Sequence, residues 1–146
     1  RIVLLPMLMK TLAISLALAS IVTAQSPLRV NQEKLLDALI KVESNGNNKA
    51  IGDNGKSIGC LQIQRAYWVD ATERSGLGGN YRDCFKRSYA KCVVRAYMNR
   101  YGKKWWNTLE GFNPEKIARI HNGGPKGYKK KATKTYWQKV RKELAK

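Results

Sequence analysis

Apolar residues recur at helical spacing along most of this chain, and the pattern predicts five helices. In the first, an Asn31 cap precedes a stripe of leucine and isoleucine that ends near Val42. The other four are expected over residues 64–73, 88–101, 113–120 and 131–144. Residues 46–59 are rich in Gly and Asn, and Asp53-Asn54-Gly55 is a turn signal that predicts a β-hairpin. The pattern therefore indicates an α+β domain, mostly α-helical, with one small hairpin.

The first 24 residues follow a different pattern. Met9-Lys10 precede an apolar run over residues 12–22, and Thr23-Ala24 supply small residues before Gln25. This order is typical of a secretory signal peptide. A transmembrane anchor is the alternative, but the run is short for a bilayer span. We therefore expect a signal peptide over residues 1–24, starting at Met7 or Met9 after upstream residues, and one domain over residues 25–146 of a secreted, extracellular protein.

The chain is strongly basic, with a formal charge of +18. Residues 1–24 hold two of its 28 basic residues and none of its 10 acidic residues, so residues 25–146 carry +16. Such a charge indicates an anionic partner: nucleic acid, acidic membrane or an acidic polymer such as a bacterial wall. Aromatic residues do not alternate with the basic run near the C-terminus, which argues against a specific nucleic-acid site. A solvated surface that keeps the protein soluble is the alternative.

Three cysteines, Cys60, Cys84 and Cys92, allow one disulfide and leave one thiol, and three pairings are open. A continuous helix would separate Cys84 and Cys92 by about 12 Å, whereas a disulfide needs Cα atoms within about 7 Å. We favour this pairing, which requires a loop between them and a helix that begins near Ser88. With one histidine and no CxxC pair, we expect neither a metal site nor a cofactor.

Two carboxylates are predicted to lie in unlike environments. Leu36, Leu39 and Glu43 fall at i, i+3 and i+7, so Glu43 lies on the buried stripe, in the last helical turn. Burial and the helix dipole are both expected to raise its pKa. Asp53 lies in a polar turn, where backbone N–H groups and Asn54 are expected to solvate its anion. One protonated and one ionised carboxyl group suit glycoside hydrolysis, although ordinary helix-end and turn residues are the alternative.

The motifs around these acids resemble those of the lysozyme superfamily. Its active-site segment is similar to Glu43-Ser44, Ala50-Ile51-Gly52-Asp53-x-Gly55 and Ser57-x-Gly59-x-x-Gln62-Ile63. Three further motifs resemble invertebrate-type lysozymes: Ala66-Tyr67-Trp68-x-Asp70, Tyr97-Met98-x-Arg100-Tyr101 and Ala118-Arg119-Ile120-His121-Asn122-Gly123-Gly124-Pro125-x-Gly127. The resemblance covers residues 35–140. It implies a lysozyme-like fold with the hairpin beside an active-site cleft, and a muramidase that cleaves bacterial peptidoglycan between N-acetylmuramic acid and N-acetylglucosamine, in defence or digestion.

The resemblance also implies roles for single residues. Glu43 stands at the position of the proton donor, and Asp53 stands at that of the second carboxylate, usually a nucleophile. A lysozyme of another branch is the standard example of this pair, so the roles are transferred. Substrate contacts are implied for Tyr67, which would stack on a sugar, and for Ser57, His121, Asn122, Gly123 and Gly124. The alternatives are a packing role for Tyr67 and a capping or packing role for His121; Gln62 suits either a hairpin or a sugar contact.

This chain departs from the family pattern in its hairpin. The usual cysteines around it are missing, and the segment from Glu43 to Asp53 is about two positions shorter, so packing and hydrogen bonds must hold it. Cys60 stands where proline is common, and we expect it to be unpaired. Two alternatives stay open: a catalytically weak cationic antimicrobial protein that binds walls or membranes, and an added isopeptidase activity with Ser57 as nucleophile and His121 or Lys56 as base.

Overall fold

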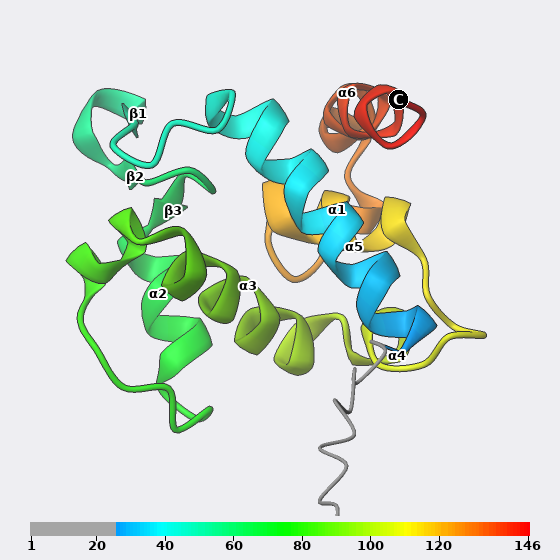
Figure 1. Cartoon of the computed structure of the whole chain (residues 1–146), viewed down its shortest axis with the longest axis horizontal. Helices are drawn as coiled ribbons and strands as arrows, with labels where there is room; N and C mark the ends of the chain where they lie inside the picture. Colours follow the sequence, from blue (N-terminus) through cyan, green and yellow to red (C-terminus); the bar gives the residue numbers. More distant parts are fainter. Residues whose placement is uncertain (1–25) are drawn as a thin grey trace, which may run out of the picture.

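Helices pack together with a small antiparallel sheet at one edge in residues 26–146, the part of the chain that the computed structural model describes (Figure 1). The predicted signal peptide lies outside these residues. The helices are α1 Pro27–Ser44, α2 Arg65–Thr72, α3 Arg87–Tyr101, α4 Lys103–Trp106, α5 Pro114–Gly123 and α6 Lys134–Leu144. Short 3-10 helices cover η1 Asp53–Gly55, η2 Tyr81–Phe85, η3 Gly127–Lys129 and η4 Lys131–Thr133. The α+β prediction is confirmed. No described helix combines the length and apolar character needed to cross a membrane.

Helix α1 begins earlier than the predicted Asn31 cap. Ser26 caps it, because its hydroxyl accepts a hydrogen bond from the Arg29 backbone N–H at 3.3 Å. Pro27 takes the first helical position, where a missing N–H costs nothing. At the other end Asn45 adopts a left-handed conformation and its N–H caps the last carbonyls. These signals place Glu43 in the last turn.

The other predicted helices are present with two differences in their bounds, and the short helix α4 was not predicted. Helix α3 begins within one residue of the expected start, and Asn113 caps α5 by accepting from the Lys116 backbone N–H at 3.0 Å. Helix α5 continues three residues beyond the expected end at Ile120 and so includes His121. Helix α6 begins at Lys134 because the preceding three residues form the 3-10 turn η4.

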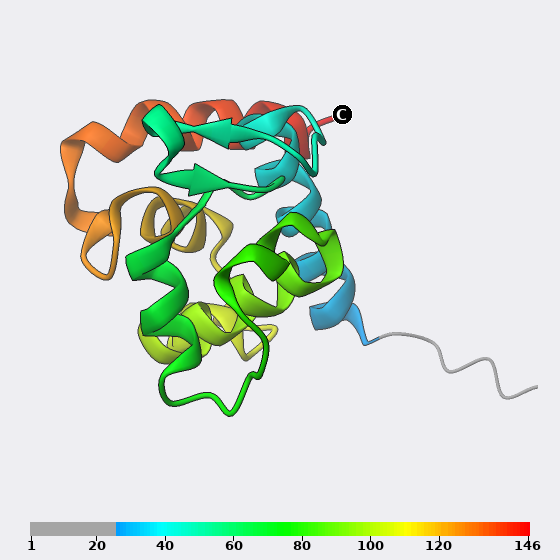
Figure 2. The same ribbon diagram turned by 90° about the vertical axis from the view of Figure 1, so that its left-hand side faces the viewer.

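The sheet has three strands in the order β1-β2-β3, each antiparallel to its neighbour. Strands β1, Ile51–Gly52, and β2, Ser57–Ile58, form the predicted hairpin; the sequence did not indicate β3, Ile63–Gln64. Ser57 lies opposite Gly52 on one side and opposite Gln64 on the other. The sheet lies at the C-terminal end of α1 (Figure 1), and in the view of Figure 2 it lies above α2 and α5.

The core holds the helices together and fixes the direction of α1. The buried face of α1 presents Leu35, Leu36 and Leu39, none of which has exposed surface. Facing residues are equally buried: Val93 and Val94 of α3, Ile117 and Ile120 of α5, and Val140 of α6. Each such side chain contributes about 1.5–3 kcal/mol over an exposed one. Because the Leu36 stripe continues to Glu43, this packing turns the carboxyl group inward.

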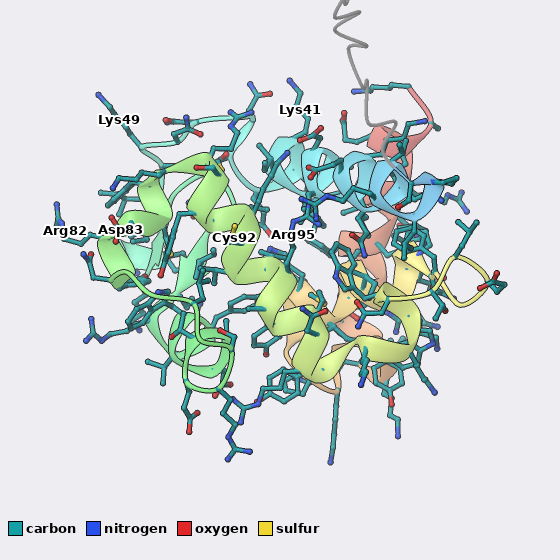
Figure 3. All side chains as sticks on the ribbon, turned by 60° about the horizontal axis from the view of Figure 1, so that its bottom comes forward. Lys41, Lys49, Arg82, Asp83, Cys92 and Arg95 are labelled. Carbon is teal, nitrogen blue, oxygen red and sulfur yellow. The ribbon has the colours of Figure 1, made fainter. Side chains whose placement is uncertain are left out.

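The predicted disulfide between Cys84 and Cys92 is wrong, since all three cysteines carry free thiols. Cys84 is buried in η2, and burial raises the pKa of its thiol to about 12. Cys92 instead lies on the outer face of α3, five residues after the helix begins, with its thiol exposed (Figure 3). The chain does loop between them as required, but one side chain faces the core and the other faces solvent.

The close approach of Gly59 to η2 has a measurable consequence. Gly59 has a φ of +76°, and a Cβ there would lie 2.1 Å from the Cys84 carbonyl oxygen. Gly76 has a similar φ of +71° with open space around it. We expect Gly76→Ala to lower the free energy of unfolding by about 1 kcal/mol through backbone strain, and Gly59→Ala to lower it by about 3 kcal/mol, since the steric clash adds to the strain. Urea unfolding measures both, and equal losses would contradict this packing.

Candidate active site

One cleft, with a volume of about 560 Å³, lies where the end of α1, the sheet, α2 and the end of α5 meet. The predicted site residues from all four segments line it together: Glu43, Asp53, Ser57, Tyr67, His121, Asn122, Gly123 and Gly124. Residues separated by as much as 81 positions in the chain therefore share one surface. The predicted set is brought together, while the role of each member stays a prediction.

Glu43 is held by two side chains at the base of this cleft. Its side chain is 18% exposed. The Tyr136 hydroxyl donates a hydrogen bond to Glu43 Oε1 at 2.7 Å, and His121 Nε2 lies 3.4 Å from the same oxygen. Among residues 26–146, no hydrogen bond reaches Oε2. One carboxyl oxygen is therefore anchored, and the other is left for a partner in the cleft.

His121 connects Glu43 to an aromatic stack. The His121 side chain is 4% exposed, and its Nδ1 lies 3.1 Å from the Tyr67 hydroxyl. Tyr67 stacks on Tyr97 with ring centroids 3.7 Å apart. Burial raises the pKa of Tyr67 well above its ordinary value, and it does the same for Tyr136, so both phenols keep their protons. His121 therefore lines the cleft and is also packed, so the cleft position and the packing position predicted for it are the same. One face of Tyr67 is already covered by Tyr97.

Asp53 occupies a more polar position. It is exposed in η1 and adopts a left-handed backbone with φ of +50°. Its Oδ2 accepts hydrogen bonds from the Ser57 hydroxyl and from Gln64 Nε2, the latter at 3.3 Å. These two bonds, and then the charge of Lys56, lower the pKa of Asp53. The expected contribution of Asn54 is wrong, because the side chains that stabilise the anion come from β2 and β3.

Side-chain hydrogen bonds hold the hairpin, as expected for a segment that lacks the usual cysteines. Gln62, with φ of +47°, donates from Nε2 to the Gly59 carbonyl at 2.9 Å. Its amide oxygen packs so closely on Gly52 that a Cβ there would lie 2.1 Å away. The Tyr81 hydroxyl donates to the Ile63 carbonyl at 2.8 Å and lies 3.1 Å from the Lys56 carbonyl. Gln62 also lines the cleft, so the residue that supports the hairpin forms part of the cleft surface.

The other residues predicted to contact the substrate differ in how exposed they are. Asn122 is exposed, and Gly124 has a φ of +81° with open space on its Cβ side. Gly123 packs inward instead, because a Cβ there would lie 2.5 Å from Thr133 Cγ2. Ser57 is buried, and its hydroxyl donates to Asp53. The bases considered for a serine nucleophile make no hydrogen bond to it in the described part of the chain.

The sequence did not identify three cleft contacts. Tyr136 was expected to face inward from the last helix, but nothing local connects it to Glu43, 93 positions earlier. Gln64 lies in the unpredicted strand β3, and only the β2–β3 register brings it to Asp53. Asp70 adds a third carboxylate to the cleft lining, and its carbonyl accepts from Arg100 at 2.7 Å. Within residues 26–146, no group of three or more His, Cys, Asp or Glu side chains is placed to hold a metal.

Comparisons with known proteins agree with this geometry. The family model described as Destabilase matches residues 32–143. A lysozyme of Meretrix lusoria is 36% identical over 75% of this chain and 88% of its own length. An invertebrate-type lysozyme of Ruditapes philippinarum is 37% identical over 80% of this chain and 84% of its own length. The crystal structure of Tapes japonica lysozyme is 32% identical with a TM-score of 0.62, over 75% of this chain and 88% of that structure.

The family match covers most of the helix that carries Glu43, the whole sheet and the segment that carries Tyr136. The relatives are matched over most of their own length, so the likeness extends beyond the short motifs around the two acids. This chain belongs to the Destabilase family and is a member of the invertebrate-type lysozymes.

Proposed function

We propose that this protein is a lysozyme that hydrolyses the β-1,4 bonds between N-acetylmuramic acid and N-acetylglucosamine in bacterial peptidoglycan. The observation that carries the proposal is that two carboxyl groups face one cleft in unlike surroundings. Glu43 is mostly buried between a phenol and an imidazole, whereas Asp53 is exposed and accepts two side-chain hydrogen bonds. Family membership supports the reaction class, a glycoside hydrolysis.

Glu43 is proposed as the general acid. Tyr136 and His121 both contact Oε1, so the proton to be donated sits on Oε2, which is free to reach the glycosidic oxygen. We assign the Tyr67 hydroxyl as the donor to His121 Nδ1, which leaves the ring hydrogen on the nitrogen that faces Glu43. Tyr136 and His121 are thus positioning residues, which hold the acid in one orientation while the leaving group departs.

Asp53 is proposed as the second carboxylate. Its lowered pKa keeps it ionised at neutral and mildly acid pH, where it attacks or electrostatically stabilises the positive centre that forms as the bond breaks. Ser57 and Gln64 hold Oδ2, so Oδ1 is the oxygen that faces the sugar. Retention and inversion of configuration both stay open, and proton NMR of the first-formed anomer distinguishes them.

Secretion is part of the proposal. The predicted signal peptide over residues 1–24 and a positive charge suited to anionic bacterial surfaces support an extracellular role in defence or digestion. The alternative is a cationic antimicrobial protein that kills without catalysis. Killing by such a protein would survive the Glu43→Gln substitution and would fall steeply with salt, since exposed charges are screened.

Removal of the proposed acid should abolish wall lysis. We expect Glu43→Gln to lower the rate of turbidity loss of bacterial walls at least 100-fold, the usual scale of general-acid catalysis. Asp53→Asn should also reduce the rate at least 10-fold. Glu110→Gln is the matched control, because Glu110 is exposed outside the cleft and should retain the rate within about twofold. Lysis by Glu43→Gln at the wild-type rate would falsify the assignment.

Loss of the Tyr136 hydroxyl should slow the reaction without weakening substrate binding. As Glu43 gives up its proton it becomes an anion, and a hydrogen bond to a charged group contributes about 1.5–3 kcal/mol. We therefore expect Tyr136→Phe to lower kcat at least 10-fold on a soluble peptidoglycan fragment, with KM within about twofold. Tyr101→Phe removes a hydroxyl outside the cleft and is the control. An unchanged kcat, or an equal loss in both variants, would count against the positioning role.

The hydrogen bond from Ser57 should set the acid limb of the pH profile. Asp53 has a pKa below its ordinary value of 3.8, so its anion persists until the pH falls through that lowered value. Ser57→Ala removes the largest cause, and the acid limb should move to higher pH, towards 3.8. Hydrolysis rates measured from neutral pH to about pH 2 test this. A limb that stays in place means that Asp53 is not the group that titrates.

A further inference from the structure

Three lysines gather over two aromatic rings on the surface formed by α4, α5 and η3. Lys104 Nζ lies 4.4 Å from the centre of the Trp105 ring. Lys116 Nζ lies 5.8 Å from that ring centre and 5.1 Å from the centre of the Tyr128 ring, and Lys129 Nζ lies 5.6 Å from the Tyr128 centre. The two ring centroids are 4.7 Å apart in an edge-on contact. We call these five residues the lysine–aromatic cluster.

The backbone fixes the three segments that carry the cluster. The Asn113 N–H donates to the Trp105 carbonyl at 3.1 Å, and Asn113 Oδ1 accepts from the Lys116 N–H, so α4 is tied to the start of α5. Helix η3 lies directly on α5, because a Cβ at Gly127 would come within 1.9 Å of the Arg119 carbonyl oxygen. The rings then hold the lysine ammonium groups through cation–π contacts. The charges are arranged before any ligand arrives, which lowers the entropy cost of binding.

The positive charges of the cluster are not neutralised by the described part of the chain. None of its three lysines forms an ion pair with a carboxylate of residues 26–146. Glu115, the neighbour of Lys116, is taken by Arg119 at 2.7 Å. Lys104 and Lys116 share one ring and lie at most about 10 Å apart, which is close to the screening length in physiological salt. The ammonium groups therefore repel one another, and a bound polyanion relieves that repulsion.

The cluster is suited to a ligand recognised by charge alone. Lysine ammonium groups lie over the aromatic rings, which disfavours base stacking and hence a single-stranded nucleic acid. Among the described residues, Leu109 is the only exposed large hydrophobic residue in the α4–α5 connection. One such side chain buries too little apolar surface to hold this face in a bilayer. None of the five cluster residues lines the cleft. We propose that the cluster is a second binding site, outside the cleft, for the phosphodiester polymers of bacterial walls.

The choice of a wall polymer among polyanions rests on the proposed wall hydrolysis, but the site itself is independent of Glu43 and Asp53. Such a site retains the enzyme on the wall between cleavage events. It differs from a general attraction by the +16 domain, because it depends on three particular lysines rather than on the total charge. Charge-matched substitutions therefore separate the two explanations.

The test measures binding to purified Gram-positive walls on ice, in the Glu43→Gln background so that the wall stays intact. One portion of the walls keeps its phosphodiester polymer and a second portion is stripped of it by acid. The cluster variant Lys104→Gln/Lys116→Gln/Lys129→Gln is compared with Lys41→Gln/Lys49→Gln/Lys139→Gln. The control lysines make no ion pair or cation–π contact in the described residues, and Lys41 and Lys49 extend into solvent (Figure 3).

We expect the cluster variant to bind complete walls at least 10-fold more weakly, and the control variant to bind within about threefold of the parent. The slope of log affinity against log salt should fall by about 3 in the cluster variant, roughly one for each lysine that no longer pairs with a phosphate. Stripped walls should bind the parent and the cluster variant equally.

Equal losses in the two variants would overturn the proposal, since net charge alone would then explain binding. Undiminished binding of the parent to stripped walls would also overturn it. Duplex DNA and vesicles of anionic lipid serve as competing probes: a cluster-dependent loss for either probe, with none for walls, assigns the surface to another partner. Digestion of walls by the Glu43→Gln protein would count against the proposed acid and leave the binding result intact.

Discussion

The hydrogen bond from Tyr136 to Glu43 Oε1 joins the last helix to the first, and the cleft depends on it. A carboxyl group that is only 18% exposed needs polar partners, because burial without them is costly. Tyr136 and His121 provide these partners from α6 and α5. The leucine stripe of α1 turns Glu43 inward, and the core residues of α3, α5 and α6 keep that stripe in place. The orientation of one side chain therefore rests on the packing of four helices.

The hairpin is held without a disulfide in the described part of the chain. Asp53, Asn54 and Gln62 all adopt left-handed backbone conformations, which cost energy for residues other than glycine. The bonds of Gln62 to the Gly59 carbonyl and of Ser57 to Asp53 offset that cost. Because the Ser57 bond ends on Asp53 in the cleft, a contact that stabilises the hairpin also lowers the pKa of Asp53. Fold and site chemistry are coupled at this point.

Among residues 26–146, charge is distributed unevenly over the surface, with carboxylates in the cleft and unpaired lysines in the lysine–aromatic cluster. The cleft holds three carboxylates, Glu43, Asp53 and Asp70, within a domain that is otherwise basic. Several lysines and arginines are already paired; Lys91, for example, binds Glu33 and Asp37 on α1. The lysine–aromatic cluster is different, because its ammonium groups rest on rings rather than on carboxylates. In our proposal a polyanionic wall polymer binds at the lysine–aromatic cluster, whereas the carboxylates lie in the cleft.

The sequence by itself determined the features that depend on neighbouring residues. Helical periodicity, the Asn113 cap and the Asp53-Asn54-Gly55 turn each act over a few positions, so the five longer helices of the described residues, the hairpin and the place of Glu43 in the last turn were predictable. The motifs around His121 also indicated which segments share a cleft. The start of α1 was misplaced, because Ser26 is as good a cap as Asn31 and precedes a proline.

Only the tertiary structure decided which distant side chains meet. Tyr136 reaches Glu43 across 93 positions, and Gln64 reaches Asp53 through a strand register that a two-residue strand does not reveal. Cys84 and Cys92 have a plausible spacing for a disulfide, yet one faces the core and the other faces solvent. Local patterns determine the position of a residue along its helix or strand and the face that carries its side chain. The partner it meets is fixed by how the whole core packs, and that packing depends on every buried residue together.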